Sequence, residues 1–445
     1  MILRLVHRLY LMLRRPVRWA RHRFTVTGAF VLAGMLMTGS ASNPAQTMGL
    51  QVFVVLVALM TVAVVLAPFF RVRFSLARQA PRFVTAGEAF TLRVTLRNLG
   101  RRAQRGLEYL ENVQDTPLTF HEFAARLRSN RGTSRAALSD PMSLVRSAQT
   151  KPALLPFLPS QGLAEVRAEI IAHRRGPLLL AGGMLARTDP FGLFRGFCRV
   201  ESPQTVLVLP RRYPLPPFAL PGQSHYQRGG VAMAAGVGES EEFVALREYR
   251  RGDSLRRVHW RSAARLGKLV VKEFQDEYFM RHALVLDTFC APPQDGMFEE
   301  AVAVAASFAC TVPDQESLLD LMFVGPQTVC VTSGRGVGHA QQMLEVLAAV
   351  QPCRQPRYGE LEALVLQHSV TLSGCLLLFL DWDQPRRALV RRLKALRVPV
   401  WVLLMRPSGR ADDFEAGPPE DQPDRLILLE SGNMVEGLRR LEDAT

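Results

Sequence analysis

Hydrophobic residues near the start of the chain form two long runs without charge. Residues 24–70 carry no charged side chain, and 50–70 is an almost unbroken apolar stretch. As a helix it is long enough to cross a hydrocarbon core of about 30 Å. A shorter apolar run, from about 24 to 40, precedes it. The pattern predicts a transmembrane helical hairpin within residues 1–71.

From residue 72 onward the hydrophobic period changes to two. Residues 90–97 and 166–170 alternate apolar and polar side chains, with glycines and prolines between such segments. This pattern predicts an antiparallel, immunoglobulin-like β-sandwich over 72–210, with a surface loop at 129–150. A Pro/Gly-rich linker at 211–238 follows.

Over 282–445 the pattern changes again, to apolar strands that alternate with amphipathic helices. Continuous apolar strands between helices predict a doubly wound α/β domain with a largely parallel sheet. Ligands of such sheets bind at the carboxyl ends of the strands. Asp287 and Asp381 each follow a predicted strand, at 283–286 and 375–380, so both are candidate site residues.

The distribution of charge predicts how the two helices are oriented across the membrane. Residues 1–23 hold seven Arg and no acid, and residues 71–105 hold nine Arg against one acid. Because arginine-rich flanks stay in the cytoplasm, we expect a two-pass inner-membrane protein with the bulk of its chain cytoplasmic. The alternative is a cleaved signal peptide ending near 41–45.

The same counts weaken a nucleic-acid interpretation. The formal net charge of +15 lies entirely in residues 1–105, and the rest of the chain is net neutral. A nucleic-acid-binding domain would carry a basic patch of its own. The sequence therefore predicts contact with a lipid bilayer and none with nucleic acid.

The segment 239–281 has the densest charged and aromatic chemistry. Its order is E-F-x-x-L-R-x-Y-x-x-G-D-x-x-R-x-x-x-W-x-x-x-A-R, contributed by Glu242, Phe243, Leu246, Arg247, Tyr249, Gly252, Asp253, Arg256, Trp260, Ala264 and Arg265. We call this set the signature. Arginines outnumber acids within it, which favours paired, ionised carboxylates over metal ligation.

Three interpretations of the signature remain open. In a structural clasp, Arg247, Arg256 and Arg265 pair with Glu242, Glu248 and Asp253, and Trp260 packs beneath them. In a second interpretation the signature is a partner-binding surface. In a third it is a hydrolase site, with Asp253 and His259 in acid/base roles and Glu242 or Glu248 holding a metal.

The signature resembles that of the bacterial domain-of-unknown-function family 58, and the turn Asp189-Pro190-Phe191-Gly192-Leu193-Phe194-Arg195 resembles a further element of the family. The resemblance implies an N-terminal transmembrane pair, a β-domain and a C-terminal domain similar to von Willebrand factor A. It also implies association with MoxR-type AAA+ ATPases and with transglutaminase-like membrane proteins. The family has no established reaction.

The von Willebrand comparison implies a specific metal site. Such domains hold Mg²⁺ through an Asp-x-Ser-x-Ser run, whereas this chain has Asp287-Thr288-Phe289-Cys290-Ala291. Only the aspartate matches, and Asp381 would stand for the distant acid. Two carboxylates hold Mg²⁺ poorly without further ligands, so we expect a degenerate remnant with no metal and no cofactor.

These observations favour a non-enzymatic scaffold or adaptor that acts with a MoxR-type ATPase in protein complex assembly or maturation. Its expected contact is an acidic rim of Asp287, Asp381 and Asp383, with Trp382 either anchoring the partner or packing on the following helix. The alternative is a membrane-tethered hydrolase that uses Asp253, His259 and Asp287.

Overall fold

The computed structural model describes most of the chain. The described residues are 23–41, 47–67, 70–114, 147–218, 242–251, 258–275, 280–290, 294–312, 317–334, 337–407 and 417–442, with single positions at 8, 12, 20, 220, 253 and 255. They divide into two units, Met1–Arg211 and Arg212–Thr445.

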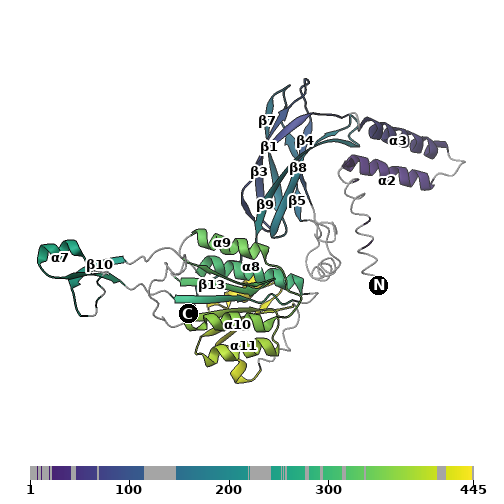
Figure 1. The fold of residues 1–445 in the computed structure, drawn as a ribbon. Helices are drawn as coiled ribbons and strands as arrows, with labels where there is room; N and C mark the ends of the chain where they lie inside the picture. The colour runs from purple at the N-terminus through teal and green to yellow at the C-terminus, as the bar shows by residue number, and fades with distance from the viewer. Residues whose placement is uncertain are drawn as a thin grey trace. The chain divides into compact units, whose positions relative to one another are not determined.

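The first unit begins with two apolar helices, α2 (Val26–Ala41) and α3 (Thr47–Leu66), which lie side by side (Figure 1). Within the described residues, one helix, Met48–Leu66, is long and apolar enough to cross a membrane; Val26–Gly39 is a shorter apolar helix. Small residues allow the close packing of the pair, because a Cβ at Gly39 would lie 3.2 Å from the ring of Phe53.

Among the described residues, nine strands in two sheets follow. They are β1 (Phe74–Gln79), β2 (Phe83–Thr85), β3 (Ala89–Asn98), β4 (Leu107–Val113), β5 (Ala148–Thr150), β6 (Ala153–Leu155), β7 (Leu163–Ala172), β8 (Gly176–Thr188) and β9 (Arg195–Leu209). One sheet has the order β1-β3-β7-β5 and the other β2-β9-β8-β4-β6. All pairs are antiparallel except β2 with β9, which is parallel. The immunoglobulin-like topology stays a prediction.

The two sheets bury a common hydrophobic core. The alternation that predicted the strands places Leu92, Val94 and Leu96 of β3 inside, where they cluster with Tyr109 of β4 and Leu180 of β8. The prediction of a surface loop at 129–150 is wrong for its last residues, which form β5 and pair with β7. The loop residues 129–146 lie outside the described residues.

A turn between β8 and β9 attaches the sheets to the helix pair. Asp189 Oδ1 accepts the backbone N–H groups of Leu193 at 2.6 Å and of Phe194 at 2.9 Å. These two apolar side chains are buried against Ala63 near the end of α3. Thr25, just before α2, donates its N–H and its hydroxyl to the carbonyl of Leu193. The start of α2 and the end of α3 therefore meet at one end of the helix pair.

The second unit contains a hairpin and an α/β domain. The hairpin strands are β10 (Glu242–Glu248) and β11 (Val270–Gln275), with α7 (Trp260–Leu266) between them. The domain comprises β12 (Met280–Leu286), α8 (Asp295–Thr311), β13 (Ser317–Val324), β14 (Thr328–Ser333), α9 (Val337–Ala349), α10 (Tyr358–His368), β15 (Gly374–Phe379), α11 (Gln384–Ala395), β16 (Val400–Arg406), β17 (Arg425–Glu430) and α12 (Met434–Arg439). Short 3₁₀ turns lie at Ser369–Thr371 and Pro419–Asp421.

The sheet of this domain has the order β14-β13-β12-β15-β16-β17. All neighbours are parallel except β13 and β14. Helices α8 and α9 lie on one face and α10 and α11 on the other (Figure 1). The mixed α/β, multi-domain prediction is therefore confirmed. The chain reverses its winding direction between β12 and β15, where a ligand crevice is expected in such sheets.

Candidate functional site

Asp287 lies at this reversal point, directly after β12. Its backbone N–H donates to Leu378 O of β15 at 2.9 Å, and its Oδ2 accepts from Leu380 N at 3.2 Å. Its Oδ1 accepts from Phe289 N at 2.9 Å. The carboxylate thus joins the ends of two strands and is itself only 1% exposed.

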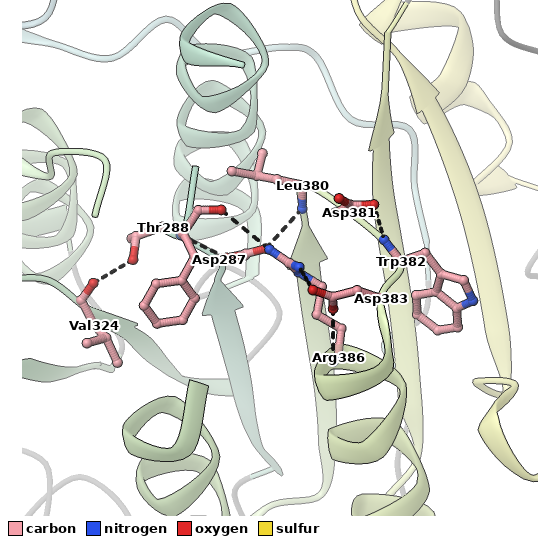
Figure 2. A network of polar contacts seen from close by, with 9 residues as sticks. Asp287, Thr288, Val324, Leu380, Asp381, Trp382, Asp383 and Arg386 are labelled. Atoms are coloured by element: carbon pink, nitrogen blue, oxygen red, sulfur yellow. Dashed lines mark hydrogen bonds and ion pairs between the residues drawn. The ribbon is translucent and has the colours of Figure 1, made fainter. Parts of the chain in front are cut away.

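An arginine forms the remaining hydrogen bonds and the ion pair of this carboxylate. Arg386, in the first turn of α11, places Nε 2.7 Å and Nη2 2.6 Å from Asp287 Oδ2 (Figure 2). Its Nη1 lies 2.7 Å from Asp383 Oδ2, and its side chain is 4% exposed. Asp383 is also the N-cap residue of α11 and accepts from Arg386 N at 3.3 Å. One guanidinium therefore bridges a buried carboxylate and a helix cap.

Aromatic rings complete the surroundings of the pair. The guanidinium carbon of Arg386 lies 4.8 Å from the ring centroid of Tyr358, which packs edge-on to Phe289 at 4.6 Å. A cavity of about 70 Å³ adjoins Asp287, Tyr358 and Arg386. Small-molecule sites usually enclose about 300–1,000 Å³, so this cavity has room for a few waters and not for a substrate of ordinary size.

Burial and pairing act in opposite directions on these charges. Burial raises the pKa of Asp287, and the charge of Arg386 and the two backbone N–H groups work against that rise. Burial alone would lower the pKa of Arg386, but the carboxylates of Asp287 and Asp383 outweigh it and raise the pKa above its ordinary value. Burial also raises the pKa of Tyr358 to about 12.

The neighbouring positions bear directly on the expected metal site. Thr288 Oγ1 donates to Val324 O and so turns away from the carboxylate (Figure 2). Asp381 is exposed and accepts from Trp382 N at 2.8 Å. Among the described residues, no group of three or more His, Cys, Asp or Glu side chains is placed to hold a metal. Arg386 supplies the positive charge at Asp287.

The acidic rim is smaller than the sequence predicted. Asp287 is buried and Asp383 is paired, so Asp381 is the exposed member of the three. Trp382 is half-buried and packs beside Phe379, with ring centroids 6.3 Å apart. This contact is with β15, so packing on the following helix and anchoring of a partner both stay predictions for this tryptophan.

The signature forms the hairpin with α7, which the sequence analysis did not predict. Glu242, Phe243, Leu246 and Arg247 lie on β10, Tyr249 directly after it, Asp253 in the next turn, and Trp260, Ala264 and Arg265 on α7. Gly252, Arg256 and the side chains of Glu242 and Phe243 lie outside the described residues.

One pair of the predicted clasp is present. Arg247 places Nη1 and Nη2 each 2.7 Å from one oxygen of Asp253, a two-pronged contact. Asp253 also accepts from Arg250 N at 2.8 Å, and the bonds from Arg247 and Arg250 lower the pKa of Asp253 to about 2. Glu248 pairs instead with Lys268 at 3.0 Å, with both side chains exposed.

One part of the clasp hypothesis, the placement of Trp260, is wrong. Trp260 does not pack beneath the ion pairs, because 65% of its surface is exposed. Arg265 is exposed in the last turn of α7. His259, a candidate general base, contacts Ser262 Oγ through Nδ1 at 2.7 Å.

Sequence reasoning missed Arg386 altogether. It stands 99 residues after Asp287, within a helix that is rich in arginine. The available signal was the spacing Asp383-x-x-Arg386 at the start of a predicted helix, which is typical of a cap that also forms an ion pair.

Comparison with known proteins places the ion pair and the signature from Leu246 onward in one family domain. The family described as "Protein of unknown function DUF58" matches residues 245–400. This chain carries a DUF58 domain. The match begins within β10 and extends through β15 and α11 to the start of β16. Both Asp253 and the Asp287–Arg386 pair therefore belong to the DUF58 domain.

A relative and two solved structures are also similar to this chain. The "Uncharacterized protein YeaD" of Bacillus subtilis (strain 168) is 26% identical over 162 residues, which are 36% of this chain and 39% of YeaD. The SpRpn10 VWA domain is 12% identical over 38% of this chain and 95% of its own, with a TM-score of 0.26. Proximal thread matrix protein 1 from the mussel byssus is 12% identical over 37% and 47%, with a TM-score of 0.27. Scores this low carry no argument about the fold of the DUF58 domain.

Proposed function

We propose that this chain is a membrane-anchored, non-enzymatic scaffold or adaptor that acts with a MoxR-type AAA+ ATPase in the assembly or maturation of protein complexes. The observation that carries the proposal is the Asp287–Arg386 pair. It fills the crevice expected at the reversal point of the largely parallel sheet with the chain's own cation. A crevice closed in this way leaves protein recognition as the best-supported role for the surrounding rim.

The hydrolase alternative would need free acid, base and metal-binding groups. Asp253 is held by Arg247, His259 contacts Ser262, and Asp287 is buried against Arg386. A low pKa keeps Asp253 ionised near neutral pH, which suits an ion pair better than proton donation. Each candidate catalytic group thus has a structural partner.

The membrane part of the proposal is a hairpin with both ends in the cytoplasm. The turn that buries Leu193 and Phe194 touches the start of α2 and the end of α3, so both helix ends face the β-sheets. The arginine-rich segments 1–23 and 71–105 flank those ends. Reporters fused near Met1 and after Thr445 should both give cytoplasmic signals. A periplasmic signal from the C-terminal reporter would contradict the hairpin and favour a cleaved signal peptide.

The proposed contact with the ATPase lies at the rim beside β15, where Asp381 is exposed. Binding of the purified full chain to the ATPase should weaken as salt rises and should not change with EDTA, because Arg386 takes the place of a metal. Asp381→Lys should weaken binding by about tenfold, or about 1.4 kcal/mol. Calorimetry or surface binding with the purified proteins measures both effects.

Glu436→Lys is the matched control, since this carboxylate is also exposed, on α12. It should bind the ATPase like the wild type. Binding that EDTA abolishes and Mg²⁺ restores would contradict the proposed contact, and so would equal losses from the two lysine variants. The same assay with a transglutaminase-like membrane protein tests the second partner implied by the family.

A further inference from the structure

The hairpin and α7 expose large apolar side chains together with arginines. Leu255, Trp260 and Leu266 are 61%, 65% and 65% exposed. Arg251, Arg261 and Arg265 are exposed in the same segment of the chain, and no ion pair between described residues engages these three guanidinium groups. We call these six residues the signature surface.

The helix geometry separates the two kinds of side chain. Arg261 and Arg265 are four residues apart, so they share one face of α7. Trp260 and Leu266 lie on either side of that face, and no residue of α7 is buried. The outward ridge of the helix is therefore basic and its flanks are apolar.

Charge is also concentrated here relative to the rest of the folded chain. Residues 242–275 hold nine basic and four acidic residues. Because residues 106–445 are net neutral, the other segments of that range carry an equal acidic excess. Among the described acids of the hairpin, Glu248 and Asp253 are already paired, with Lys268 and Arg247. The net charge that the signature surface presents is positive.

We propose that the signature surface docks on the anionic face of the bilayer in which the chain is anchored. Arginines reach lipid phosphates, and tryptophan prefers the interface between headgroups and acyl chains. The inference rests on the membrane anchoring proposed above. A covalent anchor keeps the surface near lipid at a high effective concentration, so weak attraction is sufficient. Docking gives the DUF58 domain a membrane-facing side that is separate from its Asp381 rim.

Fluorescence of the full chain in lipid nanodiscs tests the proposal. The emission of Trp260 is obtained as the difference between the wild type and Trp260→Phe, since the chain has four tryptophans. In discs that contain phosphatidylglycerol, Trp260 emission should shift to the blue and be quenched by brominated acyl chains. In discs of phosphatidylcholine alone, and in 1 M salt, both effects should disappear, because salt screens the attraction.

Charge variants separate lipid binding from other causes. The double variant Arg261→Gln, Arg265→Gln should lose the quenching at least fivefold, while Arg439→Gln, which changes another exposed arginine, on α12, should keep it. Equal emission in both lipids would overturn the proposal. Quenching that needs two chains per disc, or burial of Trp260 only after an acidic partner protein is added, would overturn it in favour of self-association or a protein groove.

Failure of this inference can be told apart from failure of the proposed function. If the chain inserts into discs and binds the ATPase through its Asp381 rim but Trp260 remains unquenched, only the lipid-docking inference fails. If a high-salt wash releases the chain from the discs, the membrane anchoring itself is wrong and both proposals fail.

Discussion

Arg386→Met should unfold the DUF58 domain at a much lower temperature than the wild type. The substitution keeps the apolar volume of the side chain but leaves Asp287 charged, buried and without its cation. Loss of one partner of a buried ion pair costs about 3–5 kcal/mol, which corresponds to a shift of Tm on the order of 10 °C for a unit of this size. Thermal unfolding of the detergent-purified chain, followed by circular dichroism, measures the shift.

A matched variant and the pH dependence identify the cause. Arg247→Met removes an arginine whose pair is partly exposed, so its shift should be clearly smaller. In Arg386→Met the folded-state pKa of Asp287 lies further above its unfolded value. A group with a raised folded-state pKa contributes to the free energy of unfolding at low pH, and that contribution is lost as pH rises. The difference in Tm between Arg386→Met and the wild type should therefore be smaller at pH 5 than at pH 8. A constant gap would show that lost packing, not charge, is the cause.

Arg78→Met should have an effect of similar size on the β-rich part of the first unit. Arg78 of β1 and Glu111 of β4 form an ion pair between the two sheets, with side chains 1% and 0% exposed. Glu111 Oε2 also accepts from the Tyr109 hydroxyl. Without Arg78 the carboxylate has no buried cation, so we expect a loss of about 3–5 kcal/mol at pH 8. Protease resistance of the first unit, measured against temperature, reports the change.

The stability of the wild-type first unit should depend on pH through the carboxyl group of Glu111. Burial raises the pKa of Glu111 to about 7, although Tyr109 and Arg78 act to lower it. A folded-state pKa above the unfolded value means that this contribution is full below about pH 4.5 and is lost as pH rises through 7. Glu111→Gln should remove up to about 3 kcal/mol of the change in the free energy of unfolding between low and high pH. An unchanged pH profile in Glu111→Gln would show that Glu111 is not the titrating group.

Where the sequence predicted the fold correctly, a repeated pattern carried the information. The apolar strand at 283–286 and its alternation with helices specify a parallel sheet, because only strands covered on both faces are apolar throughout. The alternation at 90–97 likewise specifies which side chains of β3 are buried. Such patterns are local, so a single sequence is sufficient to recognise them.

The two buried ion pairs depend on contacts that no local pattern contains. Arg386 lies in a helix with several other arginines, and only the fold brings it to Asp287. Arg78 is one of many arginines near the membrane segment and resembles a topology signal. For α7, the spacing of the apolar residues already indicated that they do not all face one core. Trp260 and Leu266 are six residues apart, which places them about 120° apart around a helix and so on different sides of α7.

The arginine that joins α11 to the end of β12 also determines how the rim is regulated. A bound metal ion can leave while the protein stays folded, so its occupancy follows the ion's concentration and exchange rate. The guanidinium of Arg386 is covalently attached to α11, so it cannot exchange with solvent as a bound ion does. Every folded copy therefore carries its own cation for Asp287, whatever the supply of divalent ions. A change of state at this end of the sheet requires a rearrangement of the Arg386 side chain or of α11 itself.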